Sequence, residues 1–333
     1  TEADLAGANL THAVLADTWM TDADLSNAVL LGADLHSADI MGTDANHANF
    51  QGADLTLVHA PDTNFRDADF TGATLNVNFN DSNAAVTATA NTATSATITT
   101  GDGADTVTVG NGGTALTNNI TTGKGNDTIT SGAGADTINA GAGANKITSG
   151  DGDDILTGGD GADTIDGGEG NDNITSAKGA DSITAGAGND TVTTTDDNDT
   201  VIGGTGDDNI TTNKGNDSVV AGDGNDTITS GTGSDYVSGG TGNDTITVGT
   251  GDDTVDGGTG NDTITVQTLS NGDSLVGGDG TDTLTIAAIS STSTPKNISG
   301  MEVVNVTSLG GGAVGIETAA ELGLRWPTSK VYL

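Results

Sequence analysis

The sequence predicts an all-β protein built as a parallel β-solenoid, in which the chain winds through stacked coils. Three features predict this fold. Acidic residues recur every nine residues through the centre of the chain, apolar residues recur every five near its start, and 53 Gly accompany only 2% aromatic residues. Strict short repeats allow each unit to bury its apolar residue against its neighbours, so no large single core is needed.

The period of five covers residues 1–79. Every fifth position from 5 to 75 is apolar, as at Leu25, Leu30 and Leu35, and a small residue, mostly Ala, stands two positions before most of them. Neither a helix nor a flat strand has this period. Four five-residue units would close one square coil, with the large and the small residue both directed inward.

Units such as Ala23-Asp24-Leu25-Ser26-Asn27 resemble the pentapeptide-repeat family. The resemblance covers about a quarter of the chain and implies a right-handed quadrilateral β-helix. It also raises an alternative function, since some pentapeptide-repeat proteins resemble an acidic DNA duplex and occupy topoisomerases. The segment has fewer than four coils, which is short for a DNA mimic.

The period of nine runs without a slip from Asp127 to Asp262, and 15 of its 16 positions are Asp, with Asn145 as the exception. Gly-x-Gly-x precedes most of these positions, and Ile, Val or Leu stands two residues after each. Glycines permit a tight turn with inward-pointing carbonyls, and the Asp adds an anionic oxygen. Calcium takes six to eight oxygen ligands, which two turns stacked one coil apart can supply.

Two nine-residue units would make one coil, so every second turn would stack on the same edge and the turns would form two rows. One row, here called the intact row, keeps Gly-x-Gly-x-Asp in every turn, whereas the other, the substituted row, loses glycines at several turns. Asn145 lacks charge and the turn before Asp199 lacks both glycines, so neither is a predicted ligand. The predicted calcium ligands of the intact row are Asp136, Asp154, Asp172, Asp190, Asp208, Asp226, Asp244 and Asp262. Those of the substituted row are Asp127, Asp163, Asp181, Asp217, Asp235 and Asp253, and Asp282 follows in a later turn.

The stretch Gly239-Gly240-Thr241-Gly242-Asn243-Asp244-Thr245-Ile246-Thr247 resembles the RTX nonapeptide family, whose pattern is typical of calcium-binding parallel β-solenoids. The resemblance implies a calcium-stabilised β-roll over residues 123–285, with several calcium ions as cofactors. It also implies a secreted bacterial protein exported by the one-step, type I route.

Four lysines, Lys124, Lys146, Lys178 and Lys214, all belong to the substituted row. We expect their ammonium groups to replace part of the missing calcium charge along that edge. Chance placement of solubilising lysines is the alternative.

Two further segments complete the predicted organisation. Residues 80–122 are rich in Thr, Ala and Asn and alternate as connecting strands. After Thr265 the period slips by two and resumes at Asp273 and Asp282, and residues 286–333 are predicted to form a short β-rich C-terminal cap. The predicted domains are therefore 1–79, 80–122, 123–285 and 286–333.

Composition excludes several classes of function. A net charge of −39 excludes direct binding of nucleic acid, which needs basic patches, and favours multivalent cations. The absence of Cys excludes disulfides and thiolate metal sites. No apolar run approaches the ~18 residues of a membrane span. All four His lie within residues 1–79, so no Ser-His-Asp arrangement can be assembled with the repeats, and we expect no enzymatic activity.

We therefore expect a secreted, calcium-dependent structural solenoid that self-assembles at a bacterial cell surface, as a surface layer, sheath, filament or adhesin stalk. Its expected partner is a second copy of the chain, and a cell-surface glycan is a second candidate. An alternative is an ice- or glycan-binding module that uses an outward ladder of Thr, although Thr is also a favourable polar residue in any strand. A tail detached from an enzyme is a further alternative. The ladder comprises Asn139, Thr157, Thr175, Thr193, Thr211, Thr229, Thr247 and Thr265.

Overall fold

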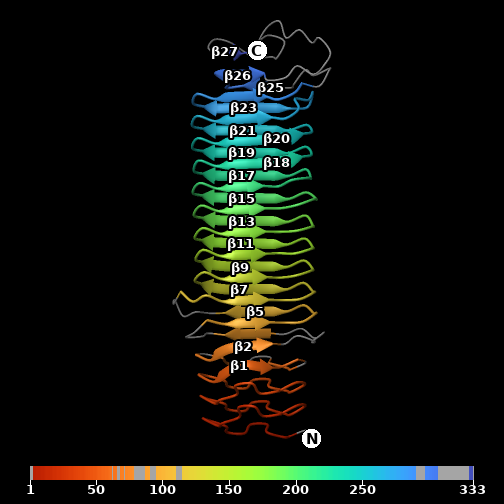
Figure 1. Cartoon of the computed structure of the whole chain (residues 1–333), viewed down its shortest axis with the longest axis vertical. Helices are drawn as coiled ribbons and strands as arrows, with labels where there is room; N and C mark the ends of the chain where they lie inside the picture. The colour runs from red at the N-terminus through yellow and green to blue at the C-terminus, as the bar shows by residue number, and fades with distance from the viewer. Residues whose placement is uncertain are drawn as a thin grey trace. The chain divides into compact units, whose positions relative to one another are not determined.

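The computed structural model describes residues 3–61, 63–65, 68–70, 72–78, 87–90, 95–109, 115–289, 297–306 and 330–332. All the regular elements in these residues are β-strands, and neighbouring strands pair in parallel, as β1 and β2 do. Figure 1 shows successive strands stacked as coils. The predicted all-β parallel β-solenoid is therefore confirmed.

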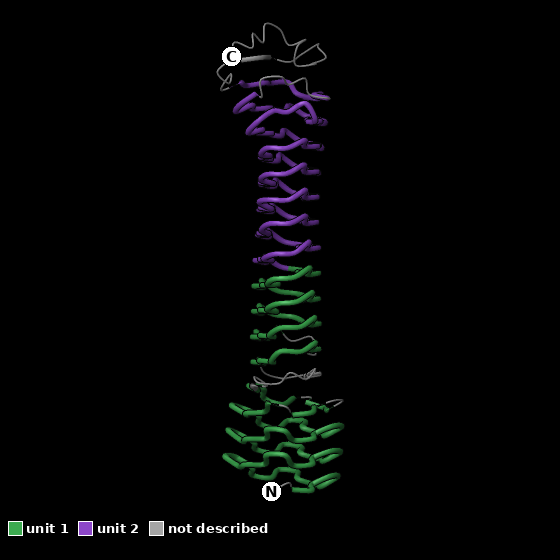
Figure 2. The backbone as a smooth tube through the Cα atoms, turned by 90° about the vertical axis from the view of Figure 1, so that its right-hand side faces the viewer, with its two compact units in different colours: residues 1–169 green, residues 170–333 purple. Residues whose placement is uncertain are grey.

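Two compact units make up the chain, residues 1–169 and residues 170–333, and they are coloured separately in Figure 2. Each is described by itself below. The domain boundaries predicted at residues 79, 122 and 285 follow changes of repeat and stay a prediction.

The pentapeptide coils of the first unit have four walls, and each coil takes four five-residue repeats. Parallel bridges join residues one coil apart on each wall, for example Asp4 to Asp24 and Asn9 to Val29. At many corners an Asp or Asn side chain accepts a nearby backbone N–H, as when Ala6 donates to Asp4 at 3.2 Å. A residue of positive φ follows, such as Asn27 at 56°. Asn, Asp, Ser and Gly tolerate that conformation best, which explains the polar residues between successive leucines.

The core of these coils is the predicted pair of inward positions. Leu25, Leu30 and Leu35 are fully buried, and the alanines two residues before them are at most 2% exposed. Phe50 stacks on Phe70 with ring centroids 5.1 Å apart. Phe65 meets Phe50 edge-on at 5.6 Å, so three aromatic rings fill the coil interior there.

The strands of the first unit form two parallel ladders. One contains β1 (Asp54–His59), β2 (Thr74–Asn78), β4 (Thr97–Thr99), β6 (Asn119–Thr121), β8 (Thr137–Asn139) and β10 (Ile155–Thr157). The other contains β3 (Thr87–Ala90), β5 (Thr106–Val109), β7 (Thr128–Ala133), β9 (Lys146–Asp151) and β11 (Thr164–Glu169). β3 to β6 are the predicted connecting strands. The glycine-containing stretch Asn111-Gly112-Gly113 of the same segment lies outside the described residues.

The second unit also has two parallel ladders. One contains β12 (Asn173–Thr175), β14 (Thr191–Thr193), β16 (Asn209–Thr211), β18 (Thr227–Thr232), β20 (Thr245–Thr250), β22 (Thr263–Val266), β24 (Thr283–Ile286), β26 (Val303–Val306) and β27 (Lys330–Tyr332). The other contains β13 (Ser182–Ala187), β15 (Thr200–Thr205), β17 (Ser218–Asp223), β19 (Tyr236–Thr241), β21 (Thr254–Thr259), β23 (Ser274–Asp279) and β25 (Asn297–Ser299).

Register explains the nine-residue period. Thr227 pairs with Thr245, and Tyr236 with Thr254, so one coil takes two nine-residue repeats and contributes one strand to each ladder. The central aliphatic residue of each strand points inward, and Ile246 and Val237 are fully buried. After Thr265 one coil is longer by two positions, since Thr263 pairs with Thr283, which confirms the predicted slip of two.

The C-terminal segment is described in part. β25 and β26 confirm closing strands within the predicted cap, and β27 pairs with β26. Residues 307–329 and residue 333 of that cap lie outside the described residues. Among the residues that are described, no helix has the length and apolarity that a bilayer crossing requires.

We predict that Phe50→Ala destabilises the protein by about 3–5 kcal/mol, because it removes the ring at the centre of the aromatic cluster. Thermal or urea unfolding followed by circular dichroism measures the change. Leu57→Ala is the matched control, since Leu57 is 58% exposed on the same coils and should cost less than about 0.5 kcal/mol. Equal losses in the two variants would contradict the assigned core.

Candidate metal centre

The turns of the nine-residue repeat bring the backbones of successive coils into close contact. Gly240 and Gly242 have φ of 112° and 125°, which other residues rarely adopt. A β-carbon at Gly240 would also collide with the carbonyl of Gly222 in the coil before. Glycine is therefore required twice over, by the backbone angle and by the approach of the next coil.

The repeat Asp residues are buried, and most of them bond to the coil before them. Oδ1 of such an Asp accepts the backbone N–H of the equivalent residue, usually 18 positions earlier, so Asp208 donates to Asp226 at 2.8 Å and Asp226 donates to Asp244 at 2.8 Å. The predicted ligands of both rows, and Asp282, are all at most 2% exposed. Within each unit, the structure therefore places the predicted ligands on two carboxylate ladders.

The second oxygen of many of these carboxylates has no donor. Oδ2 is buried without a hydrogen-bond partner at Asp190, Asp208, Asp226, Asp244, Asp253, Asp262 and Asp282. An ionised carboxylate buried in this way costs several kcal/mol unless a counter-charge meets it. The unpartnered oxygens fit a row of cations.

Backbone carbonyls would complete such sites. Within the described residues no group of three or more His, Cys, Asp or Glu side chains gathers as a metal cluster. A β-carbon added at Gly203 would meet both Oδ2 of Asp208 and the carbonyl oxygen of Ala221, one coil on. Asp244 Oδ2 and the Gly257 carbonyl flank Gly239 in the same way. One carboxylate oxygen and one carbonyl oxygen thus converge at each such turn, a donor set that suits a hard cation such as calcium.

Burial raises the pKa values of the ladder carboxylates. Desolvation is the main cause, and charge on neighbouring carboxylates adds to it. The pKa of Asp208 and of Asp253 rises to about 7, and the pKa of Asp154, Asp199 and Asp244 rises to about 6. Without a counter-charge these carboxyls therefore hold their protons to a higher pH than a solvated carboxyl does.

The substituted row keeps its ladder despite its missing glycines. Asp199, which is absent from the predicted ligands, is 1% exposed and accepts the Asp181 N–H at 2.9 Å like its neighbours. Asp197 and Asn213 adopt φ of 90° and 69° in the positions that glycine usually holds. The Asn213 amide nitrogen donates to the Thr194 carbonyl at 2.6 Å, which helps to hold that turn.

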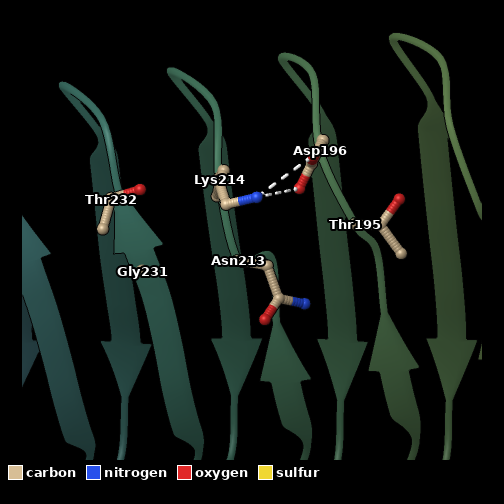
Figure 3. Close-up of a pocket in the computed structure, with 6 residues that line it drawn as sticks. All are labelled: Thr195, Asp196, Asn213, Lys214, Gly231 and Thr232. Carbon is tan, nitrogen blue, oxygen red and sulfur yellow. Dashed lines mark hydrogen bonds and ion pairs between the residues drawn. The ribbon is translucent and has the colours of Figure 1, made fainter.

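Two lysines of this row pair with carboxylates on the outer turn. Lys214 Nζ lies 3.0 Å from Asp196 Oδ1 in a surface pocket of about 480 Å³, shown in Figure 3. Lys124 Nζ lies 2.7 Å from Asp102 and is the main reason that the pKa of Asp102 falls below its ordinary value. Lys124 and Lys214 thus meet charge on exposed side chains at that edge, and the replacement of calcium charge by lysine stays a prediction. The sequence signal for these pairs is a lysine that stands one coil after an Asp at the equivalent position of the repeat, as Lys124 does after Asp102 and Lys214 after Asp196.

The ladders extend beyond the predicted ligands. Asp105 and Asn118 each donate a backbone N–H to the next ladder residue, at 2.8 Å and 2.7 Å. At the other end Asp273 accepts the Asp253 N–H at 2.9 Å, and Glu302 accepts the Asp282 N–H at 2.8 Å. Glu302 carries no repeat motif, so only the coil register identifies it.

A second ladder of hydrogen-bonded side chains runs outside the first. Asn225 donates its backbone N–H to Asp207 at 2.7 Å, and Asn243 and Asn261 donate in turn to the Asn one coil before, at 2.9 and 2.7 Å. This direction is opposite to that of the buried Asp ladder. In the recurrent Gly-Asn-Asp of the sequence, the Asp therefore bonds to a neighbouring coil on the inside of the turn, and the Asn bonds to a neighbouring coil on the outside.

We predict that, in chelator, stability falls as pH rises. A carboxyl whose folded pKa is raised stabilises the fold fully below its unfolded pKa of about 4, and loses that contribution as pH rises through about 7 at Asp208. Circular dichroism in EDTA should therefore show a larger folded fraction near about pH 5 than near about pH 8. The same comparison in saturating calcium is the control, and the difference should be largely removed there. A metal-free folded fraction that rises with pH would contradict the prediction.

Comparisons with known proteins identify both repeats. The model of the RTX calcium-binding nonapeptide repeat matches residues 112–264 in overlapping segments and residues 267–285, which together exceed half of the chain. The model of pentapeptide repeats matches residues 20–56 and 48–83. A comparison with curated protein sequences finds no match.

Two solved structures are similar to parts of the chain. A pentapeptide repeat protein from the Arabidopsis thaliana thylakoid lumen is 31% identical to this chain, with a TM-score of 0.15. The match covers 24% of this chain and 61% of that protein. HetL, a pentapeptide repeat protein involved in heterocyst differentiation regulation in Nostoc sp. strain PCC 7120, is 13% identical over 56% of this chain and 78% of its own, with a TM-score of 0.25. The ladders, the glycine turns and the family match agree: the chain belongs to the RTX calcium-binding nonapeptide repeat family and carries pentapeptide repeats before that segment.

Proposed function

We propose that calcium binding to the two carboxylate ladders holds the nonapeptide coils folded, and that the folded solenoid is a structural element at a bacterial cell surface. The observation that carries the proposal is the repeated buried Oδ2 with no donor, next to a carbonyl oxygen of the following coil. RTX repeats bind calcium, and the ladder supplies carboxylates for it.

Charge accounts for the coupling between binding and folding. Coils of a parallel solenoid lie ~4.8 Å apart. Two ionised carboxylates at that spacing repel by about 3 kcal/mol at an effective dielectric constant of about 20. The Asp side chains would hold the ions, and the divalent charge would neutralise two neighbouring carboxylates. Binding energy is then largely folding energy.

Calcium concentration suggests where the chain folds. Extracellular modules bind calcium at ~10⁻⁴–10⁻³ M, well above cytosolic levels. A chain of net charge −39 would repel itself and stay open until it met such calcium. This supports a secreted protein, and RTX repeats are typical of secreted bacterial proteins.

Exposed apolar side chains support contact with another molecule. On the pentapeptide coils Trp19 is 87% exposed, Val14 79% and Leu57 58%. Aromatic residues are enriched at protein–protein interfaces, so the exposed Trp19 is the residue that best supports such a contact. We infer a structural, non-catalytic role in which copies of the chain assemble with one another.

We predict that EDTA unfolds residues 123–285 and that millimolar calcium restores them, because the ladder charge is uncompensated without the ions. Circular dichroism measures the folding, and electron microscopy of the same samples measures the assembly. Ordered particles should form only with calcium. Magnesium at equal concentration is the control, since it demands near-octahedral geometry and dehydrates reluctantly.

Two results would count against the proposal in different ways. An unchanged dichroism spectrum in EDTA would contradict calcium-dependent folding. Calcium-dependent folding with no assembly at any concentration would contradict the structural role alone.

A second candidate function rests on one face of the second unit. In the ladder that contains β12, β14, β16, β18, β20, β22 and β24, the outward positions pair in register as two columns. Together the two columns hold 12 Thr and two Asn, and none of these residues is charged. The opposite ladder, β13 to β23, carries Ile202, Tyr236, Asp256 and other mixed residues at the equivalent positions. A simple strand preference for Thr would act on both faces. The contrast favours a flat hydroxyl surface for an uncharged periodic ligand, either ice or a crystalline glycan.

We predict that Thr229→Tyr and Thr247→Tyr abolish any such binding, because each ring breaks the flat hydroxyl columns. Thermal hysteresis tests ice, and co-sedimentation with insoluble polysaccharide tests glycan. Thr184→Tyr on the opposite ladder is the control and should leave binding intact. Wild-type protein that is inactive in both assays would remove this candidate.

A further inference from the structure

Each ladder residue and the turn around it is here called a rung. At the rung of Asn145, in the substituted row, protein hydrogen bonds satisfy both polar atoms of the side chain. Its Oδ1 accepts the Asp127 N–H at 3.0 Å and its own N–H donates to Asp163 Oδ1 at 2.8 Å, so it keeps both contacts of the ladder. Its amide nitrogen then donates to the carbonyl of Gly158, 13 residues on, at 3.2 Å. Because the oxygen of the side chain is committed to a backbone N–H, the nitrogen has to be the atom that faces this carbonyl.

Asn118 repeats the arrangement independently in the other row. Its Oδ1 accepts the Ala96 N–H at 3.0 Å, and its N–H donates to Asp136 Oδ1 at 2.7 Å. The amide nitrogen donates to the Ser131 carbonyl, again 13 residues on, at 3.2 Å, and it also contacts Asp136 Oδ1 at 2.9 Å and the Leu116 carbonyl at 3.3 Å. Both side chains are at most 2% exposed. Two asparagines in two different rows thus meet the same carbonyl of the repeat.

At the aspartate rungs the same carbonyl faces an oxygen. Asp208 Oδ2 and the carbonyl of Ala221, which holds the equivalent position in its repeat, flank the α-carbon of Gly203. Asp244 Oδ2 and the Gly257 carbonyl flank Gly239. Neither oxygen can donate a hydrogen bond to the other, and Oδ2 of Asp208 and of Asp244 has no donor elsewhere. The asparagine rungs therefore differ from those of Asp208 and Asp244 in a single side-chain atom, and the asparagine rungs are complete without a ligand.

We propose that Asn118 and Asn145 are cation-free rungs, at which the side-chain amide nitrogen replaces the bound cation of the aspartate rungs. This rests on the calcium binding proposed above and specifies which rungs need it. Both asparagines lie in the first nonapeptide coils, and Asp273 at the far end is also closed, since its Oδ2 accepts the Ser270 N–H at 2.7 Å. Protein donors thus close these three rungs, and the aspartates whose Oδ2 has no donor carry the metal dependence.

If the proposal is right, Asp→Asn at an interior rung converts a cation-dependent rung into a cation-free one and does not simply remove a stabilising contact. Asp208→Asn should bind at least one calcium fewer than wild type, measured by equilibrium dialysis. It should also be more folded than Asp207→Asn when free calcium is held at the wild-type folding midpoint. Asp207 is the matched control, because it is the adjacent residue, it is exposed, and its substitution removes the same charge. Asp208→Ala, which lacks the amide, should be less folded than either.

The reciprocal variant tests the natural asparagine. Asn145→Asp should shift the folding midpoint to higher calcium, because it places an oxygen opposite the Gly158 carbonyl. Asp208→Asn that is no better folded than Asp207→Asn, or Asn145→Asp with an unshifted midpoint, would overturn the proposal. Failure of calcium binding itself would show separately, as wild-type folding that does not respond to calcium. Urea unfolding of Asp208→Asn against Asp207→Asn would then still test the amide contact.

Discussion

A buried carboxylate that has a donor for only one of its two oxygens is the constraint on which the nonapeptide segment depends. At Asp226, Oδ1 accepts the Asp208 N–H at 2.8 Å while Oδ2 is buried without a donor. The first contact holds two coils in register. The second leaves an anionic oxygen in a place that water does not reach, so the fold is complete only with a counter-charge. Register and ion requirement therefore come from the same side chain.

The glycines matter because they bring the coils close enough for that contact. A β-carbon at Gly240 or Gly242 would run into the carbonyl of the coil before, and both residues need positive φ. The turn before Asp199 shows what happens without them. Asp197 adopts φ of 90°, and the Lys214–Asp196 pair joins the outer turns of two coils. The buried Asp199 keeps its place, so the ladder tolerates a substituted turn when surface contacts support it.

Two repeats of different length share one mode of stacking. The pentapeptide coils use four repeats and four corners, and many of these corners are capped by an Asp or Asn side chain such as Asp4. Those caps lie on the outside and meet water. The nonapeptide coils use two repeats and two turns, and they direct their Asp inward. An acidic residue is thus a solvated turn former in one segment and a metal-dependent element in the other, although both segments are acidic parallel solenoids.

The sequence by itself determined the repeat lengths, the inward apolar positions and the identity of the ladder residues. Period and chemistry suffice for these, because a strict repeat places equivalent residues above one another whatever the details of the coil. Leu25, Ile246 and Asp244 follow from that rule alone. The slip after Thr265 follows from it too, since inserting two residues can only lengthen one coil.

Only the tertiary structure decided which atoms meet across the coils. Hydrogen-bond direction is a property of two stacked turns, so no single repeat reveals that Asp207 and Asn225 form an outer ladder or that Glu302 accepts the last N–H. The same holds for Lys214, whose reach to Asp196 is set by the spacing of coils. It holds most of all for Asn145, which looks like a defect in a row of aspartates. The carbonyl of Gly158, brought opposite its amide by the winding of the chain, makes it a closed rung.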